Sequence, residues 1–155
     1  MILRFVRGSD SISRLIIAQE KTAMPITPSH VEAVTPDGFY LGAHYSTGVE
    51  ERKPGYDSAW LAGELILPLP ATPEQDAAFY TFLRSKIGEP YDWSSIFGFV
   101  FTGHHHEVDH AICSALVSLA LRHCGWFASP LAAPAHLVSP RDLLLILSGR
   151  IVVPM

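Results

Sequence analysis

The sequence predicts a single α+β domain that spans residues 1–155. The chain has 155 residues, close to the usual size of one compact domain. It is 48% hydrophobic and 17% charged, which supplies enough apolar side chains for a sizeable core. Short strand-like runs and capped helical segments also follow one another, with no repeat or low-complexity linker that would divide the chain.

Charge and hydropathy exclude two broad classes of function. The formal net charge is −4 and the sequence pI is about 6.0, so a general nucleic-acid binder is not expected. The longest apolar runs, residues 96–101 and 143–147, fall short of the roughly 20 residues that span a bilayer, so no transmembrane segment is expected. The first ten residues carry an arginine inside a short apolar run, which is unlike a secretory signal and leaves a cytoplasmic or phage-associated location open.

The first half of the chain predicts short strands and one helix. A Pro36-Asp37-Gly38 turn signal separates two alternating apolar runs, a pattern typical of a β-hairpin. Ser9 or Asp10 can cap the helix. The expected elements are a strand over 2–6, a helix over 9–21, a loop over 24–29, hairpin strands over 30–34 and 39–45, and a strand over 64–69 ended by Pro68 and Pro70.

The second half predicts mainly helices. Thr72 can cap a helix whose first position suits Pro73, and Gln75 can complete a capping box. This helix is expected to end at Ile87 before Gly88, with a buried stripe of Phe79, Phe82, Leu83 and Ile87. The other expected elements are a short helix over 93–101, a histidine-rich loop over 103–110, a buried helix over 112–124 stopped by Gly125, a helix over 137–148 begun by Ser139-Pro140, and an edge strand over 151–153.

The two cysteines are expected to be free thiols. Cys113 and Cys124 lie eleven residues apart in one predicted helix. At about 1.5 Å rise per residue their Cα atoms would be roughly 16 Å apart. A disulfide needs Cα atoms within about 7 Å, so each thiol requires its own explanation.

Cys113 is the candidate nucleophile, because it lies in the first turn of a helix. There the helix dipole and unpaired amides stabilise a thiolate and can hold an oxyanion. A thiol nucleophile needs a base, and His30 at the start of a hairpin strand is the best candidate. Glu32 points to the same face of that strand and can orient the imidazole. The hairpin register sets His44 or Tyr45 opposite His30, so His44 is a rival for that third position.

Four short motifs resemble those of a known hydrolase family. They are Ser29-His30-Val31-Glu32, then Gly48-Val49, then residues 88–93 (GEPYDW), then residues 112–117 (ICSALV). In this order they resemble the circularly permuted NlpC/P60 (YiiX/YebB-like, papain-like) cysteine hydrolases, in which the histidine precedes the cysteine. The resemblance implies a papain-like fold, with the cysteine helix packed on an antiparallel sheet that carries the histidine.

The resemblance also implies roles for individual residues. Cys113 matches the nucleophile, His30 the base and Glu32 the acidic position. Tyr91 matches the motif tyrosine, which can donate to the oxyanion or line the pocket. Ser114, which follows the nucleophile, and His44 are the other candidates for the oxyanion site or the pocket. Two departures concern the substrate: Ala115 stands where the permuted branch often has glutamate, and Ile112 precedes the nucleophile instead of aspartate.

The expected activity is therefore cofactor-free hydrolysis of an amide bond by a cysteine peptidase or amidase. Bacterial cell-wall stem peptides are the first substrate candidate. A lipid acyl hydrolase or transferase on the same fold is an alternative, and so is a non-catalytic structural or adaptor module of a phage particle or secretion apparatus. A metal-binding module that uses His104, His105 and His106 is less favoured, because adjacent histidines rarely chelate one ion and no spaced zinc motif is present. Trp60, Trp93 and Trp126 are expected in the core and not as stacking platforms.

Overall fold

The computed structural model describes residues 1–19, 26–90, 113–127, 131 and 134–149. Several sequence predictions lie outside these residues: the helix over 93–101, the histidine-rich loop over 103–110, the edge strand over 151–153, and the positions of Tyr91, Trp93 and Ile112. Within the described part, no helix is long and apolar enough to cross a membrane.

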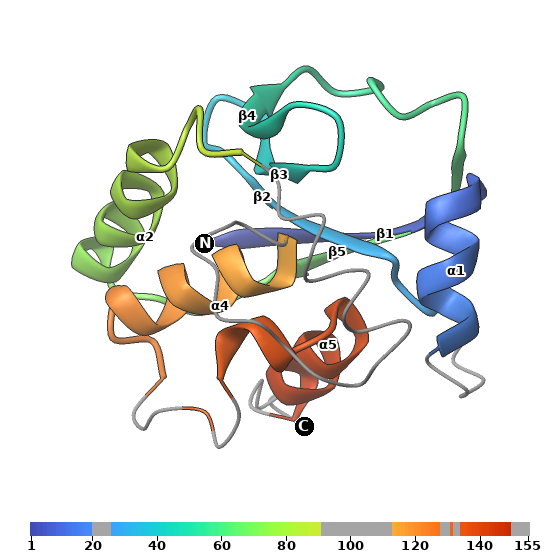
Figure 1. Cartoon of the computed structure of the whole chain (residues 1–155). Coiled ribbons are helices and arrows are strands. Elements are labelled where there is room, and N and C mark those ends of the chain that lie inside the picture. The colour runs from blue at the N-terminus through green and yellow to red at the C-terminus, as the bar shows by residue number, and fades with distance from the viewer. Residues whose placement is uncertain (20–25, 91–112, 128–130, 132–133, 150–155) are drawn as a thin grey trace.

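A five-stranded antiparallel sheet forms the framework of the described residues, and helices pack against it (Figure 1). The strand order is β4-β3-β2-β1-β5, so β4 and β5 are the two edges. This arrangement confirms the predicted α+β class. The strands are β1 (Ile2–Gly8), β2 (His30–Val34), β3 (Tyr40–His44), β4 (Gly48–Arg52) and β5 (Leu61–Pro68).

The β2–β3 hairpin forms as the sequence predicts. Its turn closes with the Gly38 amide donating to the Thr35 carbonyl at 2.9 Å, and Gly38 has a φ of 84°. The register pairs Ala33 with Leu41 and Val34 with Tyr40. Because the strands are antiparallel, continuing that register sets His30 opposite His44 and Glu32 opposite Gly42.

The two faces of the sheet differ in chemistry, because side chains alternate along each strand. One face contributes Leu3, Phe5, Val31, Ala33, Leu41 and Ala43 to the hydrophobic core, all of them buried. Three α-helices pack there: α2 (Pro73–Ser85), α4 (Cys113–His123) and α5 (Pro140–Ser148), the last preceded by a 3-10 turn, η1 (Ala135–Leu137). The other face carries Arg4, Glu32 and their polar partners. Helix α1 (Ser11–Gln19) follows β1 directly.

Helix α4 is the central helix of the described fold, as the sequence predicts. It contacts α2, α5, β2, β3 and η1, and eight of its eleven residues are buried. It ends before Gly125, which has a φ of 70° and takes the left-handed conformation common after a helix. Cys113 is thereby held at the first position of a rigid element.

Other helix boundaries also follow the sequence signals. Capping boxes form at Thr72 with Gln75 and at Ser139 with Asp142. Asp10, and not Ser9, caps α1, because its carboxylate accepts from the amides of residues 12 and 13, each at 3.0 Å.

Three expectations are wrong. Ile87 is 48% exposed and does not belong to the buried stripe of α2, because the helix ends at Ser85. Strand β5 begins at Leu61, earlier than expected, and includes Pro68. Proline has no backbone N–H, but an edge strand tolerates it because the missing donor can lie on the side of the strand that has no neighbour. Strand β4 was not expected at all, since its sequence GVEER lacks an apolar alternation.

Candidate functional site

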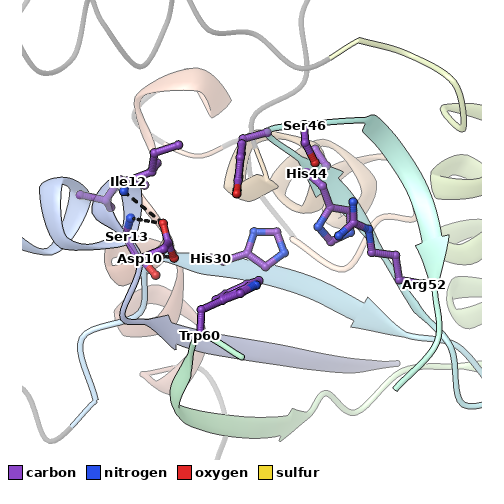
Figure 2. A pocket seen from close by; sticks show the side chains of 12 residues that line it. Asp10, Ile12, Ser13, His30, His44, Ser46, Arg52 and Trp60 are labelled. Atoms are coloured by element: carbon purple, nitrogen blue, oxygen red, sulfur yellow. Dashed lines mark hydrogen bonds between the residues drawn. The ribbon is translucent and has the colours of Figure 1, made fainter. Parts of the chain in front are cut away.

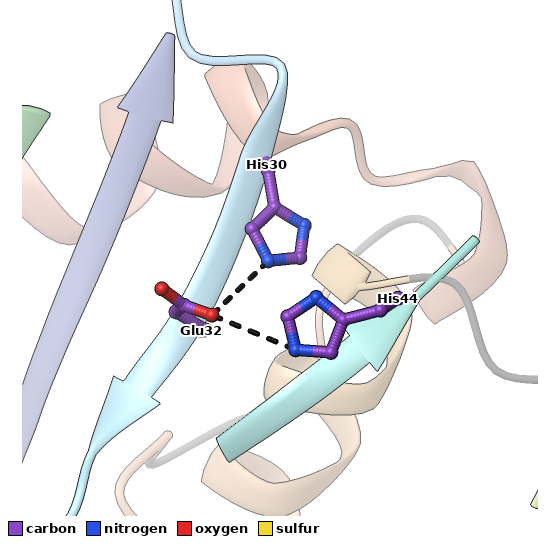
Figure 3. A group of neighbouring side chains, drawn as sticks. All are labelled: His30, Glu32 and His44. Atoms are coloured by element: carbon purple, nitrogen blue, oxygen red, sulfur yellow. Dashed lines mark hydrogen bonds and ion pairs between the residues drawn. The ribbon is translucent and has the colours of Figure 1, made fainter. Parts of the chain in front are cut away.

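Three side chains from neighbouring strands converge on the polar face of the sheet (Figure 3). His30 and Glu32 lie two residues apart on β2 and so point to the same side. His44 reaches them from β3, and the His30 and His44 ring centroids are 5.0 Å apart. The Glu32 Oε2 atom lies 3.3 Å from the His30 Nε2 and 3.7 Å from the His44 Nε2. One carboxylate oxygen therefore faces two imidazoles.

The Cys113 thiol meets the His30 imidazole. Burial alone would lower the pKa of His30, but the charge of Cys113 and the hydrogen bond with it, supported by Glu32, raise this pKa to about 10. Burial would conversely raise the pKa of Cys113, yet the positive His30 and its hydrogen bond lower it. Each group thus favours the charged form of the other, and the pair favours a thiolate facing an imidazolium.

Each ring nitrogen of His30 has its own partner. The Nε2 atom faces Glu32 at 3.3 Å, which leaves Nδ1 as the nitrogen for the thiol. Backbone N–H groups of Val31 and Ser114 also donate towards the Cys113 sulfur and lower its pKa further. The Ser114 amide belongs to the first turn of α4, the place where the sequence predicts thiolate stabilisation.

Glu32 is completely buried and is fixed by two further residues. Its Oε1 atom accepts from the Arg4 guanidinium at 2.6 Å, and its Oε2 atom accepts from the Tyr56 hydroxyl at 3.0 Å. Burial works against the ionised carboxylate, but hydrogen bonds from His30 and Arg4 lower the pKa of Glu32. Burial and the nearby Glu32 charge raise the pKa of Tyr56, so its hydroxyl stays protonated and remains a donor.

Arg4 is the centre of a buried ion network. Only 2% of its side chain is exposed, and it pairs with Glu32 at 2.6 Å, Asp57 at 2.7 Å and Glu64 at 2.6 Å. The Tyr40 ring lies against its guanidinium, 4.3 Å from centroid to Cζ. The network therefore connects β1, β2, β3, β5 and the turn before β5 around a single cation.

His44 is a neutral imidazole in this environment. Burial and the positive charge of His30 lower its pKa to about 3, although Glu32 opposes this effect. It is 5% exposed, and its Nε2 atom has no hydrogen-bond partner among the described residues. The edge of the Tyr56 ring packs against it at 5.2 Å between centroids.

A pocket opens beside His30 and His44 (Figure 2). Asp10 and Ser13 form one side, Trp60 lies below His30 in the view, and Arg52 stands on the opposite side. The lining divides almost evenly between polar and apolar surface, and Cys113 is not part of it. Trp60 was expected in the core, but it lines this pocket because it sits in the turn that leads into β5. Trp126 is partly buried against the core, as expected.

Two of the sequence motifs meet in space. The amide of Val49 donates to the carbonyl of Glu89 and the amide of Gly88 donates to the carbonyl of Val49, both at 2.9 Å. A Cβ atom on Gly48, whose φ is 83°, would lie 2.2 Å from the Glu89 oxygen. This close approach requires glycine at position 48 and explains why that motif contains one.

The structure thus brings together Cys113, His30, Glu32 and His44, and Ser114 lies buried next to the thiol. Both cysteines are free, as predicted. Sequence reasoning missed Arg4 and Tyr56 as partners of Glu32. Arg4 could have been found from the sequence, because it is a charged residue in the middle of the apolar run 2–6. Such a residue indicates a buried ion pair when the run forms an inner strand.

Comparisons with known proteins identify no family. No protein-family model matches the chain, and no curated protein is significantly similar to it. The resemblance to the permuted NlpC/P60 hydrolases therefore depends on the short motifs alone.

Proposed function

We propose that this protein is a cysteine hydrolase with a papain-like arrangement of the permuted NlpC/P60 type, in which Cys113, His30 and Glu32 form the catalytic group. The observation that carries the proposal is the continuous contact from thiol to imidazole to carboxylate. A nucleophile, a base and a group that orients the base are the three parts that covalent acyl transfer needs.

The proposed reaction has two stages. The Cys113 thiolate attacks an amide carbonyl carbon and forms a carbon–sulfur bond, while the His30 imidazolium gives its Nδ1 proton to the leaving amine. Water then attacks the thioester carbonyl carbon, His30 takes a proton from that water, and the carbon–sulfur bond breaks. This step releases the carboxylic acid and restores the Cys113 thiolate beside the His30 imidazolium. The N–H groups near the start of α4, such as that of Ser114, are suited to hold the oxyanion.

Glu32 is proposed as the third member in preference to His44. It is the nearer partner of His30, and its negative charge stabilises the imidazolium form of the base. The charged and polar side chains in the lining of the adjacent pocket, which include Asp10, Ser13 and Arg52, favour a peptide substrate over a long lipid acyl chain. Bacterial cell-wall stem peptides are accordingly the first substrate class to test.

The test compares three proteins on purified peptidoglycan fragments and on a lipid ester, with products identified by mass spectrometry. The wild-type protein and Cys124→Ala are expected to cleave the peptide substrate, and Cys113→Ala is expected to be inactive while its circular dichroism stays unchanged. Cleavage of the lipid ester alone would reassign the substrate class. Activity retained by Cys113→Ala, or no cleavage of either substrate by wild type, would overturn the proposal, and the latter result favours a structural or adaptor module.

Thiol alkylation gives a second readout that needs no substrate. The pKa of Cys113 is lowered by His30, whereas burial raises the pKa of Cys124. Iodoacetamide at neutral pH is therefore expected to modify Cys113 first. Equal rates at the two cysteines would contradict the assignment of Cys113 as an activated nucleophile.

A further inference from the structure

We propose that His30, Glu32 and His44 also form a binding site for a divalent transition metal such as Zn²⁺, and that the bound metal switches the cysteine chemistry off. The metal site stands on its own geometry, whereas the switch rests on the proposed hydrolase function. Sequence spacing does not reveal the site, because its ligands come from two strands and not from one local motif.

The separations of the donor atoms fit tetrahedral coordination. Bonds of about 2.0–2.1 Å from zinc place neighbouring ligand atoms of a tetrahedron roughly 3.3–3.4 Å apart. The Glu32 Oε2 atom lies 3.3 Å from His30 Nε2 and 3.7 Å from His44 Nε2. All three side chains offer ligand atoms within 4.8 Å of one another. The two histidine nitrogens must therefore approach each other by up to about 1.4 Å to complete three corners of the tetrahedron, which leaves the fourth for water.

His44 supplies the second observation. Its side chain is 95% buried, its Nε2 atom points at the shared carboxylate oxygen, and that nitrogen has no hydrogen-bond partner among the described residues (Figure 3). An unsatisfied buried polar atom costs about 1–3 kcal/mol. A metal ion bound to this nitrogen would satisfy it, whereas the hydrolase chemistry gives it no task.

The charge around the site suits a dication. Three carboxylates, those of Glu32, Asp57 and Glu64, surround the single guanidinium of Arg4, which leaves two formal negative charges. A divalent ion neutralises them. Arg4 and Tyr56 would act from outside the ligand shell by orienting the carboxylate, as hydrogen-bonded partners of metal ligands commonly do. Of the other nearby cations, Arg52 is already paired with Glu50, and the His30 imidazolium gives up its Nε2 proton when a metal binds that nitrogen.

The metal and the thiol would occupy opposite edges of the same imidazole. With Nε2 bound to metal, a neutral His30 keeps its proton on Nδ1, the nitrogen that faces Cys113. The ring can then no longer accept a proton from the thiol or from water. Glu32 is simultaneously withdrawn from its role of stabilising the imidazolium. Binding of the metal therefore disables the base without requiring a bond to sulfur.

Metal binding is tested without any activity assay, by titrating Zn²⁺ into the full chain in competition with a chromophoric chelator. The triple variant His104→Gln/His105→Gln/His106→Gln controls for binding by the histidine-rich segment, and Cys113→Ser controls for binding by the thiol. Both variants are expected to retain one tight Zn²⁺ site per chain. His44→Ala is expected to weaken Zn²⁺ at least about 100-fold, beyond the typical effect of an outer partner. Unchanged affinity in His44→Ala, or no binding in the triple variant, would overturn the site.

Cobalt spectroscopy on the wild-type protein guards against a His44→Ala variant that fails to fold. Bound Co²⁺ is expected to show visible bands of a four- or five-coordinate site without a thiolate charge-transfer band, and such a band would overturn the ligand assignment. The switch is tested on hydrolysis, which Zn²⁺ should abolish and a chelator should restore. Undiminished hydrolysis in the zinc-loaded protein would overturn the switch. A protein that binds zinc but never hydrolyses would instead refute the proposed function.

Discussion

In the proposed mechanism, His30 acts through both of its ring nitrogens, and each nitrogen has a different requirement. The Nδ1 side needs a thiol that can give up its proton, and the Nε2 side needs a negative charge that holds the ring in place. A buried carboxylate satisfies the second requirement only if it stays ionised, which is the contribution of Arg4 and Tyr56 to Glu32. In that mechanism, the reactivity of the Cys113 sulfur depends on residues that do not contact it.

Replacing the charge of Glu32 without changing its shape should therefore impair the proposed reaction. Glu32→Gln is expected to lower kcat at least about 100-fold, because the imidazolium loses its counter-charge and its orientation. The measurement is kcat and KM on the peptide substrate proposed above. Glu64→Gln is the matched control, since Glu64 contacts Arg4 but not His30. Equal losses in the two variants would show that Glu32 acts only as a partner of Arg4.

At the scale of elements, the β2–β3 hairpin brings three polar side chains together by its register. Gly42 faces Glu32 across this hairpin, and a Cβ atom at position 42 would lie 2.9 Å from the Glu32 Cβ. That distance is shorter than van der Waals contact permits. The absence of a side chain at position 42 therefore makes room for the buried carboxylate.

Gly42→Ala should displace Glu32. The expected result is a loss of about 1–3 kcal/mol in the free energy of unfolding, from overpacking, together with a lower kcat. Urea denaturation and steady-state kinetics measure the two effects. Gly63→Ala on β5 is the control, because a Cβ atom there meets nothing within 4 Å. A fully stable and active Gly42→Ala variant would disprove the close approach.

The cap of α1 predicts a pH-dependent contribution to stability. Burial opposes ionisation of Asp10, but hydrogen bonds from Ser13 and nearby amides lower its pKa. A lowered pKa means that the stabilisation is present above the ordinary aspartate pKa of about 3.9 and is lost as the pH falls. Asp10→Ala should cost about 1 kcal/mol at pH 7, measured by urea denaturation, and less at pH 3.

Ser9→Ala serves as the comparison for this cap, because Ser9 was the other cap candidate and its hydroxyl instead donates to the Trp60 carbonyl. A cost below about 0.5 kcal/mol is expected for this surface change. An Asp10→Ala cost that does not shrink between pH 7 and pH 3 would show that the carboxylate charge is not what stabilises the helix.

Sequence patterns predicted elements well where local chemistry decides them. The hairpin turn, the capping box at Thr72 and the helix that carries Cys113 all follow from short-range signals, and each forms at or within a residue or two of its expected position. Strand β4 escaped notice because its charged residues suit a sheet edge, where a strand needs little apolar surface. The role of Tyr56 could not be predicted, because its turn between β4 and β5 comes to lie over the polar face of the sheet only when the chain folds.

For the whole molecule, the Arg4 network is the feature that joins distant parts of the chain. It links four strands and the turn before β5 through a guanidinium that is 2% exposed. Breaking a buried ion pair by removing one partner leaves uncompensated charge, which typically costs about 3–5 kcal/mol. The sheet should therefore depend on this one side chain more than on any exposed arginine.

Arg4→Met should lower the free energy of unfolding by about 3–5 kcal/mol, because three carboxylates lose their cation. Chemical denaturation monitored by tryptophan fluorescence gives the value. Arg7→Met on the same strand is the control, since Arg7 is exposed, and a change within about 0.5 kcal/mol is expected. A similar, small effect of both substitutions would show that the network contributes specificity of structure and not stability.

The order of the elements along the chain has a consequence for biosynthesis. All five strands that the structure describes precede the helix that begins at Cys113. At about 5–20 residues per second, the ribosome adds the cysteine several seconds after His30. A nascent or prematurely terminated chain can thus carry the imidazole and its acidic partner but no sulfur nucleophile, so the proposed hydrolytic activity cannot arise before residue 113 has been added.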